Sequence, residues 1–256
     1  MHWLSATHCW TPCMSDRLIL LPGWGLSSAP LEPLATALRA LDTSVQVQIE
    51  SLPALGSARL EDWLDELDER LPDDTWLGGW SLGGMLAAEL AARRGDRCNG
   101  LLTLASNTCF VARANWPEAM PDETFDAFLA GCETDPKAIL KRFVLLCAQG
   151  AANPRELSRR LAAAVPSPTQ RLVEGLQVLA ALDTRAALQA FAGPQLHVFA
   201  GRDALVPAAA VSGLRGILPR AEISLFEQAS HAFMLEEPHR VAGAIGAFMR
   251  GRDFDE

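Results

Sequence analysis

The stretch Gly79-Trp80-Ser81-Leu82-Gly83 has the pattern of a nucleophile elbow, in which a serine stands at the tip of a sharp turn between a strand and a helix. Such a turn presses backbone against backbone, so glycine is needed on both sides of the serine. The flanking sequence fits this context, because residues 75–77 form a short apolar run and residues 85–92 are rich in strong helix formers. The pattern therefore predicts that Ser81 is an activated nucleophile.

Strand-like and helix-like segments alternate around this elbow, which is typical of a parallel sheet covered by helices. Strands are expected at 18–21, 45–49, 75–77, 101–105, 196–200 and 223–226, and helices at 60–71 and 241–249. From about 106 to 188 only helix-like stretches appear, which is too long for one crossover. We expect this insert to form a helical cap over the carboxyl edge of the sheet. The predicted division is a core, 1–107 and 189–256, and a cap, 108–188.

A serine hydroxyl needs a neighbouring base, and histidine is the usual one. His231 is favoured among the five histidines, because it follows the last expected strand and completes the chain order nucleophile, acid, histidine. The other four are less suitable: two lie in the N-terminal stretch, one within an expected strand and one at a helix start (His2, His8, His197 and His239).

The acid that orients the histidine should lie in a loop between the nucleophile and the base. Asp203 directly follows the expected strand at 196–200, whereas the rival Asp183 has no strand before it, so Asp203 is preferred. An oxyanion hole needs two backbone donors. We assign them to the amide of Leu82, which follows the nucleophile, and to the amide of Trp24, in the Gly-rich loop after the first core strand.

Composition excludes several classes of protein. The net charge of −9 disfavours general nucleic-acid binding, which depends on a basic surface. No apolar stretch reaches the length of a membrane span, and the first ten residues lack the features of a signal peptide, so no membrane association and a cytoplasmic location are expected.

The six cysteines show no CxxC spacing, and reduced thiols are expected. His8, Cys9 and Cys13 could be imagined as metal ligands, but no fourth ligand is near, so neither a metal site nor a cofactor is predicted. Residues 1–13 either have little structural role or contribute a peripheral strand around 3–7.

Several segments resemble the BioH family, the pimeloyl-acyl-carrier-protein methyl ester esterases of biotin synthesis. They are 23–26, 76–84, 105–110, 112–113, 116–117 and 142–143. The stretch from Cys109 to Pro117 is the most specific to this family, whereas the elbow is shared by many hydrolases. The resemblance implies an α/β-hydrolase fold with the triad on Ser81, Asp203 and His231 and the oxyanion donors on Trp24 and Leu82. It also implies acyl-chain contacts at Trp24 and along Phe143, Val144, Leu145, Leu146 and Cys147. The chain departs from the family at Pro22, where a histidine is usual, and at Ala54, where a glycine is usual.

The charge pattern of the insert independently suggests an acidic partner. Between Lys137 and Arg160 there are six basic residues and one acidic residue, Glu156, in a chain that is otherwise acidic. Arg155 and Arg159 share a helix face, and together with Arg142 they could steer an acyl-carrier protein and its phosphate-bearing arm. The alternative is a solvated helix face with no partner.

These observations predict a serine carboxylesterase that hydrolyses the methyl ester of pimeloyl-acyl-carrier protein, releasing methanol, through a Ser-His-Asp acyl-enzyme. One alternative is a broad-specificity carboxylesterase or thioesterase of the same fold. Another is a ligand-binding protein that keeps the fold without the chemistry, although no triad member is missing. A monomer is expected.

Overall fold

The fold is built on one central β-sheet. The computed structural model describes residues 16–166 and 171–251. Six strands form one sheet in the order β2-β1-β3-β4-β5-β6, and every neighbouring pair is parallel. They are β1 (Arg17–Leu21), β2 (Gln46–Ile49), β3 (Thr75–Trp80), β4 (Cys98–Leu104), β5 (Gln195–Ala200) and β6 (Glu222–Phe226). The prediction of a parallel sheet flanked by helices is confirmed.

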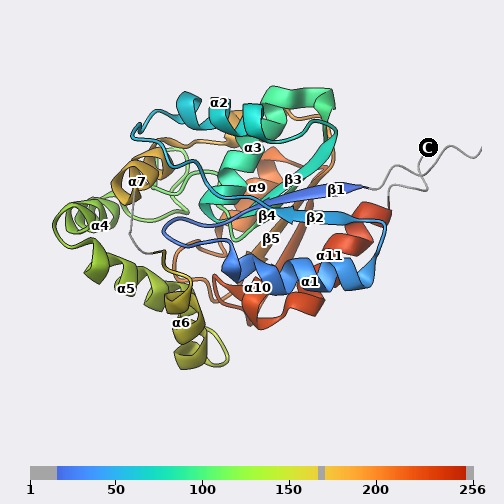
Figure 1. The fold of residues 1–256 in the computed structure, drawn as a ribbon. Coiled ribbons are helices and arrows are strands. Elements are labelled where there is room, and N and C mark those ends of the chain that lie inside the picture. Colours follow the sequence, from blue (N-terminus) through green and yellow to red (C-terminus); the bar gives the residue numbers. More distant parts are fainter. Residues whose placement is uncertain (1–15, 167–170, 252–256) are drawn as a thin grey trace, which may run out of the picture.

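Helices cover both faces of this sheet (Figure 1). α1 (Glu32–Leu41) and α11 (Pro238–Arg250) pack together on one face, whereas α2 (Leu60–Arg70), α3 (Leu82–Arg94) and α8 (Arg185–Ala190) pack on the other. α9 (Ala210–Ile217) packs against β6. β3 and β5 are buried along their whole length, as expected for strands covered on both faces.

Five of the described helices lie between β4 and β5 along the chain, and the first four of them gather at one end of the molecule (Figure 1). These four are α4 (Asp122–Thr134), α5 (Pro136–Ala148), α6 (Pro154–Ala163) and α7 (Leu172–Ala181). The start of α5 is capped by the Asp135 carboxylate and that of α6 by the Asn153 side chain, each followed by proline. We call α4 to α7 the cap helices. The division at 108 and 188 stays a prediction, and α8, which crosses the boundary at 188, packs against α3 of the core.

Four strands match their predicted ranges to within one residue, and two differ by more. The strand expected at 75–77 continues to Trp80, because Gly78 lies tightly against Leu102 of the neighbouring strand, where a Cβ would be 3.1 Å from the Leu102 carbonyl oxygen. The strand expected at 101–105 runs from Cys98 to Leu104, and Ala105 turns out of it with a φ of 48°. Gly78 and Gly79 therefore belong to β3, although a prediction based on runs of apolar residues leaves glycines out.

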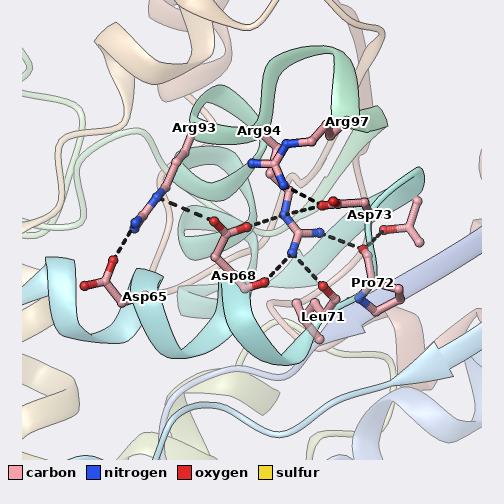
Figure 2. A network of polar contacts seen from close by, with 9 residues as sticks. Asp65, Asp68, Leu71, Pro72, Asp73, Arg93, Arg94 and Arg97 are labelled. Carbon is pink, nitrogen blue, oxygen red and sulfur yellow. Dashed lines mark hydrogen bonds and ion pairs between the residues drawn. The ribbon is translucent and has the colours of Figure 1, made fainter.

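A network of polar contacts joins the C-terminal ends of α2 and α3 (Figure 2). The fully buried Arg94 side chain donates to the Asp68 carboxylate at 2.7 Å and to the carbonyl oxygens of Leu71 and Pro72 at 2.7 and 2.8 Å. Carbonyl groups at a helix end lack donors within the helix, so Arg94 supplies them. The network holds α2 against α3, the helix that follows Ser81.

None of the helices in the described ranges is long and apolar enough to cross a membrane. The four cysteines within those ranges, Cys98, Cys109, Cys132 and Cys147, are buried and form no disulfide.

Candidate active site

Ser81 lies in the turn between β3 and α3 in a strained backbone conformation, with φ 54° and ψ −120°. Both flanking glycines are required there by contact. A Cβ on Gly79 would lie 2.3 Å from the Gly83 carbonyl carbon, and one on Gly83 would lie 2.4 Å from the Leu21 carbonyl oxygen. The Ser106 hydroxyl donates to the Ser81 carbonyl oxygen at 2.8 Å and so fixes the turn from the end of β4. The elbow therefore has the geometry that its sequence predicts.

His231 and Asp203 meet in the loops that follow β6 and β5. His231 Nδ1 lies 2.7 Å from Asp203 Oδ2, and both side chains are almost completely buried. The other carboxylate oxygen, Oδ1, accepts from the amides of Leu205 and Val206 at 2.8 and 2.9 Å. With its Nδ1 bonded to a carboxylate, the imidazole carries its proton there and leaves Nε2 as an acceptor. Nε2 is buried and has no hydrogen-bond partner among the described residues, so no hydrogen bond joins it to the Ser81 hydroxyl in this structure.

Trp80 brings the histidine loop alongside the elbow. Its indole Nε1 donates to the His231 carbonyl oxygen at 3.0 Å, and the two rings lie 5.5 Å apart between centroids. Because Trp80 directly precedes Ser81, this hydrogen bond ties the backbone of His231 to the end of β3. Sequence reasoning missed this role, although an aromatic residue before the serine is a visible signal.

The two predicted oxyanion donors, the amides of Trp24 and Leu82, lie on chain segments that contact each other. Leu82 begins α3, and amides of a first helical turn have no acceptor within the helix. Trp24 follows β1, and the contact of Gly83 with the Leu21 and Pro22 carbonyls places this chain segment directly against the elbow. The Trp24 indole is buried among the cap helices, where Nε1 donates to the Leu172 carbonyl oxygen at 2.8 Å.

The segment expected to contact an acyl chain, 143–147, has one side facing the protein interior and one side lining an outer groove. Phe143 packs edge-on against Trp24 with 5.0 Å between ring centroids, which places it beside the predicted oxyanion loop. Cys147 is fully buried near Asp203; burial raises the pKa of its thiol well above the ordinary value, and the Asp203 charge adds to this effect. Val144 and Leu145 line an outer groove, and the Leu145 side chain is 55% exposed. Leu146 is half-buried. The acyl-chain role of these residues stays a prediction.

The outer groove lies between α5 and α6 and has a volume of about 810 Å³. We call it the cap groove. Its basic lining residues are Lys137, Lys141, Arg155 and Arg159, and its apolar lining includes Leu140, Val144 and Leu145. Arg159 pairs with Glu156 at 2.6 Å on the exposed face of α6, while Arg142 is exposed but does not line the groove. Two of the three arginines predicted to dock a partner therefore share one concave surface.

The rival residues lie elsewhere. Asp183 pairs with Arg185 at 2.6 Å, a hydrogen bond that lowers the pKa of Asp183 to about 2. His197 is buried within β5 beside the Thr103 hydroxyl at 2.7 Å, and burial lowers its pKa to about 4. Neither residue is bonded to His231. His2, His8, Cys9, Cys13 and the strand considered at 3–7 lie outside the described residues.

This arrangement combines a serine on a strained turn, a carboxylate-oriented imidazole and two candidate backbone donors. Groups of these kinds are the ones that nucleophilic acyl transfer requires: a nucleophile, a base that accepts its proton and donors that stabilise the oxyanion.

Comparisons with known proteins agree with this geometry. A sequence model described as the Alpha/beta hydrolase family matches residues 8–244. The chain is 36% identical over 248 residues to the pimeloyl-[acyl-carrier protein] methyl ester esterase of Aromatoleum aromaticum, covering 91% of this chain and 98% of the relative. It is 37% identical over 238 residues to the biotin biosynthesis bifunctional protein BioHC of Cellvibrio japonicus, covering 90% of this chain and 47% of the relative. The chain thus spans about half the length of that bifunctional relative.

Solved structures share the fold at low sequence identity. The esterase EaEST from Exiguobacterium antarcticum matches with a TM-score of 0.79 and 17% identity, covering 92% of each chain. The bromoperoxidase from Bacillus anthracis matches with a TM-score of 0.81 and 18% identity over the same shares.

Proposed function

Because the chain belongs to the alpha/beta hydrolase family and, within it, to the BioH family of pimeloyl-[acyl-carrier protein] methyl ester esterases, we propose that it is a serine esterase of biotin biosynthesis. Its proposed substrate is the methyl ester of pimeloyl-acyl-carrier protein, and its products are the free pimeloyl-acyl-carrier protein and methanol. The observation that carries this proposal is the 36% identity to such an esterase over almost the entire length of both chains. The contact of His231 with Asp203 beside the elbow supports it.

The proposed mechanism assigns one step to each group. His231 Nε2 accepts the Ser81 hydroxyl proton while Ser81 Oγ attacks the ester carbonyl carbon. The amides of Trp24 and Leu82 donate to the oxyanion, and Asp203 stabilises the imidazolium. The tetrahedral intermediate collapses, and methanol leaves with the proton from His231. Water then attacks the acyl-enzyme: His231 accepts a proton from the water and passes it to the Ser81 oxygen as the acid is released.

The cap groove suits an acidic carrier protein. Four basic side chains line it, one of them, Arg159, paired with Glu156, on a chain of net charge −9, so the groove attracts an acidic partner more than the acidic remainder of the chain does. One lining residue of the groove lies beside the proposed oxyanion loop. Leu140 lines the groove, and the Leu140 side chain packs against Gly25, the residue after Trp24.

The test compares two substrates in matched charge-reversal variants. The double variant Arg155→Glu/Arg159→Glu should lower kcat/KM for the carrier-bound methyl ester about tenfold or more and leave a soluble ester such as p-nitrophenyl butyrate unaffected. Arg215→Glu/Arg220→Glu, at exposed positions outside the groove, makes the same charge change and should affect neither substrate. Ser81→Ala provides the inactive blank.

Equal losses on both substrates would show that the arginines serve folding instead of docking. Similar wild-type rates on the carrier-bound ester and on unrelated soluble esters would favour a broad-specificity esterase. Failure of a fluorophosphonate probe to label Ser81 would refute the proposed chemistry.

A further inference from the structure

Glu236 bonds to two segments that are far apart in the chain. It ends the short helix α10 (Phe233–Glu236), which follows the catalytic histidine. Its Oε2 accepts from the Ser230 amide at 3.2 Å and from the Ser230 hydroxyl at 2.5 Å. Its Oε1 accepts from the Ala152 amide at 3.1 Å, in the turn that joins α5 to α6. One carboxylate therefore connects the residue before His231 with the cap helices.

The same turn also contacts the loop of the catalytic acid. Gly150 has a φ of 88°, and a Cβ there would lie 2.4 Å from the carbonyl oxygen of Arg202, the residue before Asp203. At the end of α6, Arg160 donates to the Leu235 carbonyl oxygen at 3.1 Å. The segment between α5 and α6 thus lies against both loops that carry the acid and the base.

The position of Ser230 explains why this link matters. Ser230 is completely buried, and its amide and hydroxyl bond to a single carboxylate oxygen, which fixes the peptide that leads into His231. A general base must lie within hydrogen-bond reach of the proton it accepts, and misplacement of about 1 Å can lower a rate about a hundredfold. The location of the base therefore depends on what holds Ser230.

We propose that Glu236 is a positioning residue that couples the α5–α6 turn of the cap to the catalytic histidine. The inference deepens the proposed function and rests on its serine-esterase part. Glu236 does not touch the reacting atoms; it acts through Ser230. Since α6 also carries Arg155 and Arg159 of the cap groove, a partner that binds the groove acts on the same helix whose start is tied to the histidine loop.

The variant Glu236→Gln tests this coupling with little change in volume. Each Glu236 oxygen accepts from a backbone amide, so a glutamine must turn its NH₂ group towards one of those donors and lose that bond. We expect kcat for p-nitrophenyl butyrate to fall about tenfold with KM within twofold of wild type. Labelling by a fluorophosphonate should slow by the same factor, because it reports serine activation. Glu237→Gln, which removes only an exposed ion pair with Arg240, is the matched control and should behave as wild type.

A second variant removes the other partner. Ala152→Pro deletes the amide that donates to Glu236 Oε1 and leaves the carboxylate in place. It should lower kcat to a similar extent, and Glu236→Gln combined with Ala152→Pro should lose little more than either single variant, since both break the same connection.

The outcomes separate the two proposals. A kcat within twofold of wild type in folded Glu236→Gln overturns the coupling, as does full additivity in the double variant. If thermal unfolding shows that Glu236→Gln has lost its fold, Ala152→Pro alone decides in the same way. The soluble ester reports the coupling whichever natural substrate is correct, whereas an inactive wild-type enzyme on the carrier-bound ester refutes only the proposed substrate.

Discussion

Gly83→Ala should damage the oxyanion hole without touching a triad residue. Gly83 lies in the first turn of α3, and the added Cβ would lie 2.4 Å from the Leu21 carbonyl oxygen and 2.5 Å from that of Pro22. These carbonyls belong to the chain that leads from β1 to Trp24. The methyl group therefore pushes apart the two segments that supply the proposed oxyanion donors.

The size of the effect follows from these distances. Ordinary contact begins near 3.4 Å, so the two segments must separate by about 1 Å. A displacement of that size at a reacting centre lowers a rate about a hundredfold, and removal of one oxyanion donor costs about 10² to 10³ in kcat. Overpacking costs about 1 to 3 kcal/mol of stability, partly offset by about 1 kcal/mol because alanine favours a helix more than glycine does. The variant should remain folded while its kcat falls about a hundredfold.

The assay measures kcat on a soluble ester and the free energy of unfolding in urea. Gly243→Ala is the matched control, because Gly243 lies within α11 with no heavy atom within 4 Å of an added Cβ. It should stabilise the protein by up to about 1 kcal/mol and leave kcat unchanged. A folded Gly83→Ala variant that keeps kcat within threefold of wild type would refute the assignment of the second donor to the segment after β1.

Two further predictions concern charge. Asp203→Asn should lower kcat about 10⁴-fold with the fold intact, because an amide NH₂ facing Nδ1 forces the imidazole proton onto Nε2; wild-type rates on a soluble ester would contradict this role. Burial, followed by the charges of Asp183 and Glu61, raises the pKa of Glu89 from 4.5 to about 7. The folded protein therefore binds this proton more tightly than the unfolded chain does, so the contribution of Glu89 to stability is most favourable below pH 4.5 and is lost as the pH rises through 7. Glu89→Gln should stabilise the protein by about 1 to 2 kcal/mol at pH 8 and hardly at pH 5 in urea unfolding, and an equal gain at both pH values would refute the shift.

The sheet was predictable because the buried strands of a parallel sheet consist of runs of apolar residues. All six expected strands are present, and the elbow at Ser81 follows from two glycines whose Cβ atoms would collide with backbone. Strand ends were less predictable. Gly78 and Gly79 belong to β3 because of close packing across the sheet, and a local apolar pattern does not record which residues lie on the neighbouring strand.

Chain order also predicted the contact between Asp203 and His231. Both follow strands whose carboxyl ends meet at one edge of a parallel sheet, so two residues 28 positions apart become neighbours. The contacts of Trp80 with the His231 carbonyl, 151 positions away, and of Glu236 with Ala152, 84 positions away, follow from no such rule. They depend on how the cap and the loops pack, which neither periodicity nor composition encodes.

The contacts that the sequence did not predict show which elements hold His231 in place. The imidazole ring of His231 is held by Asp203, and its backbone is held on one side by Trp80 of the core. On the other side, Ser230 is held by Glu236, whose second oxygen is bonded to the turn between α5 and α6. A nucleophile elbow specifies only the serine, whereas His231, the proposed base, is held by elements from both the sheet and the cap helices. Substitutions in the α5–α6 turn should therefore alter serine reactivity even where they touch no substrate, and cap sequence cannot be exchanged between relatives independently of the histidine loop.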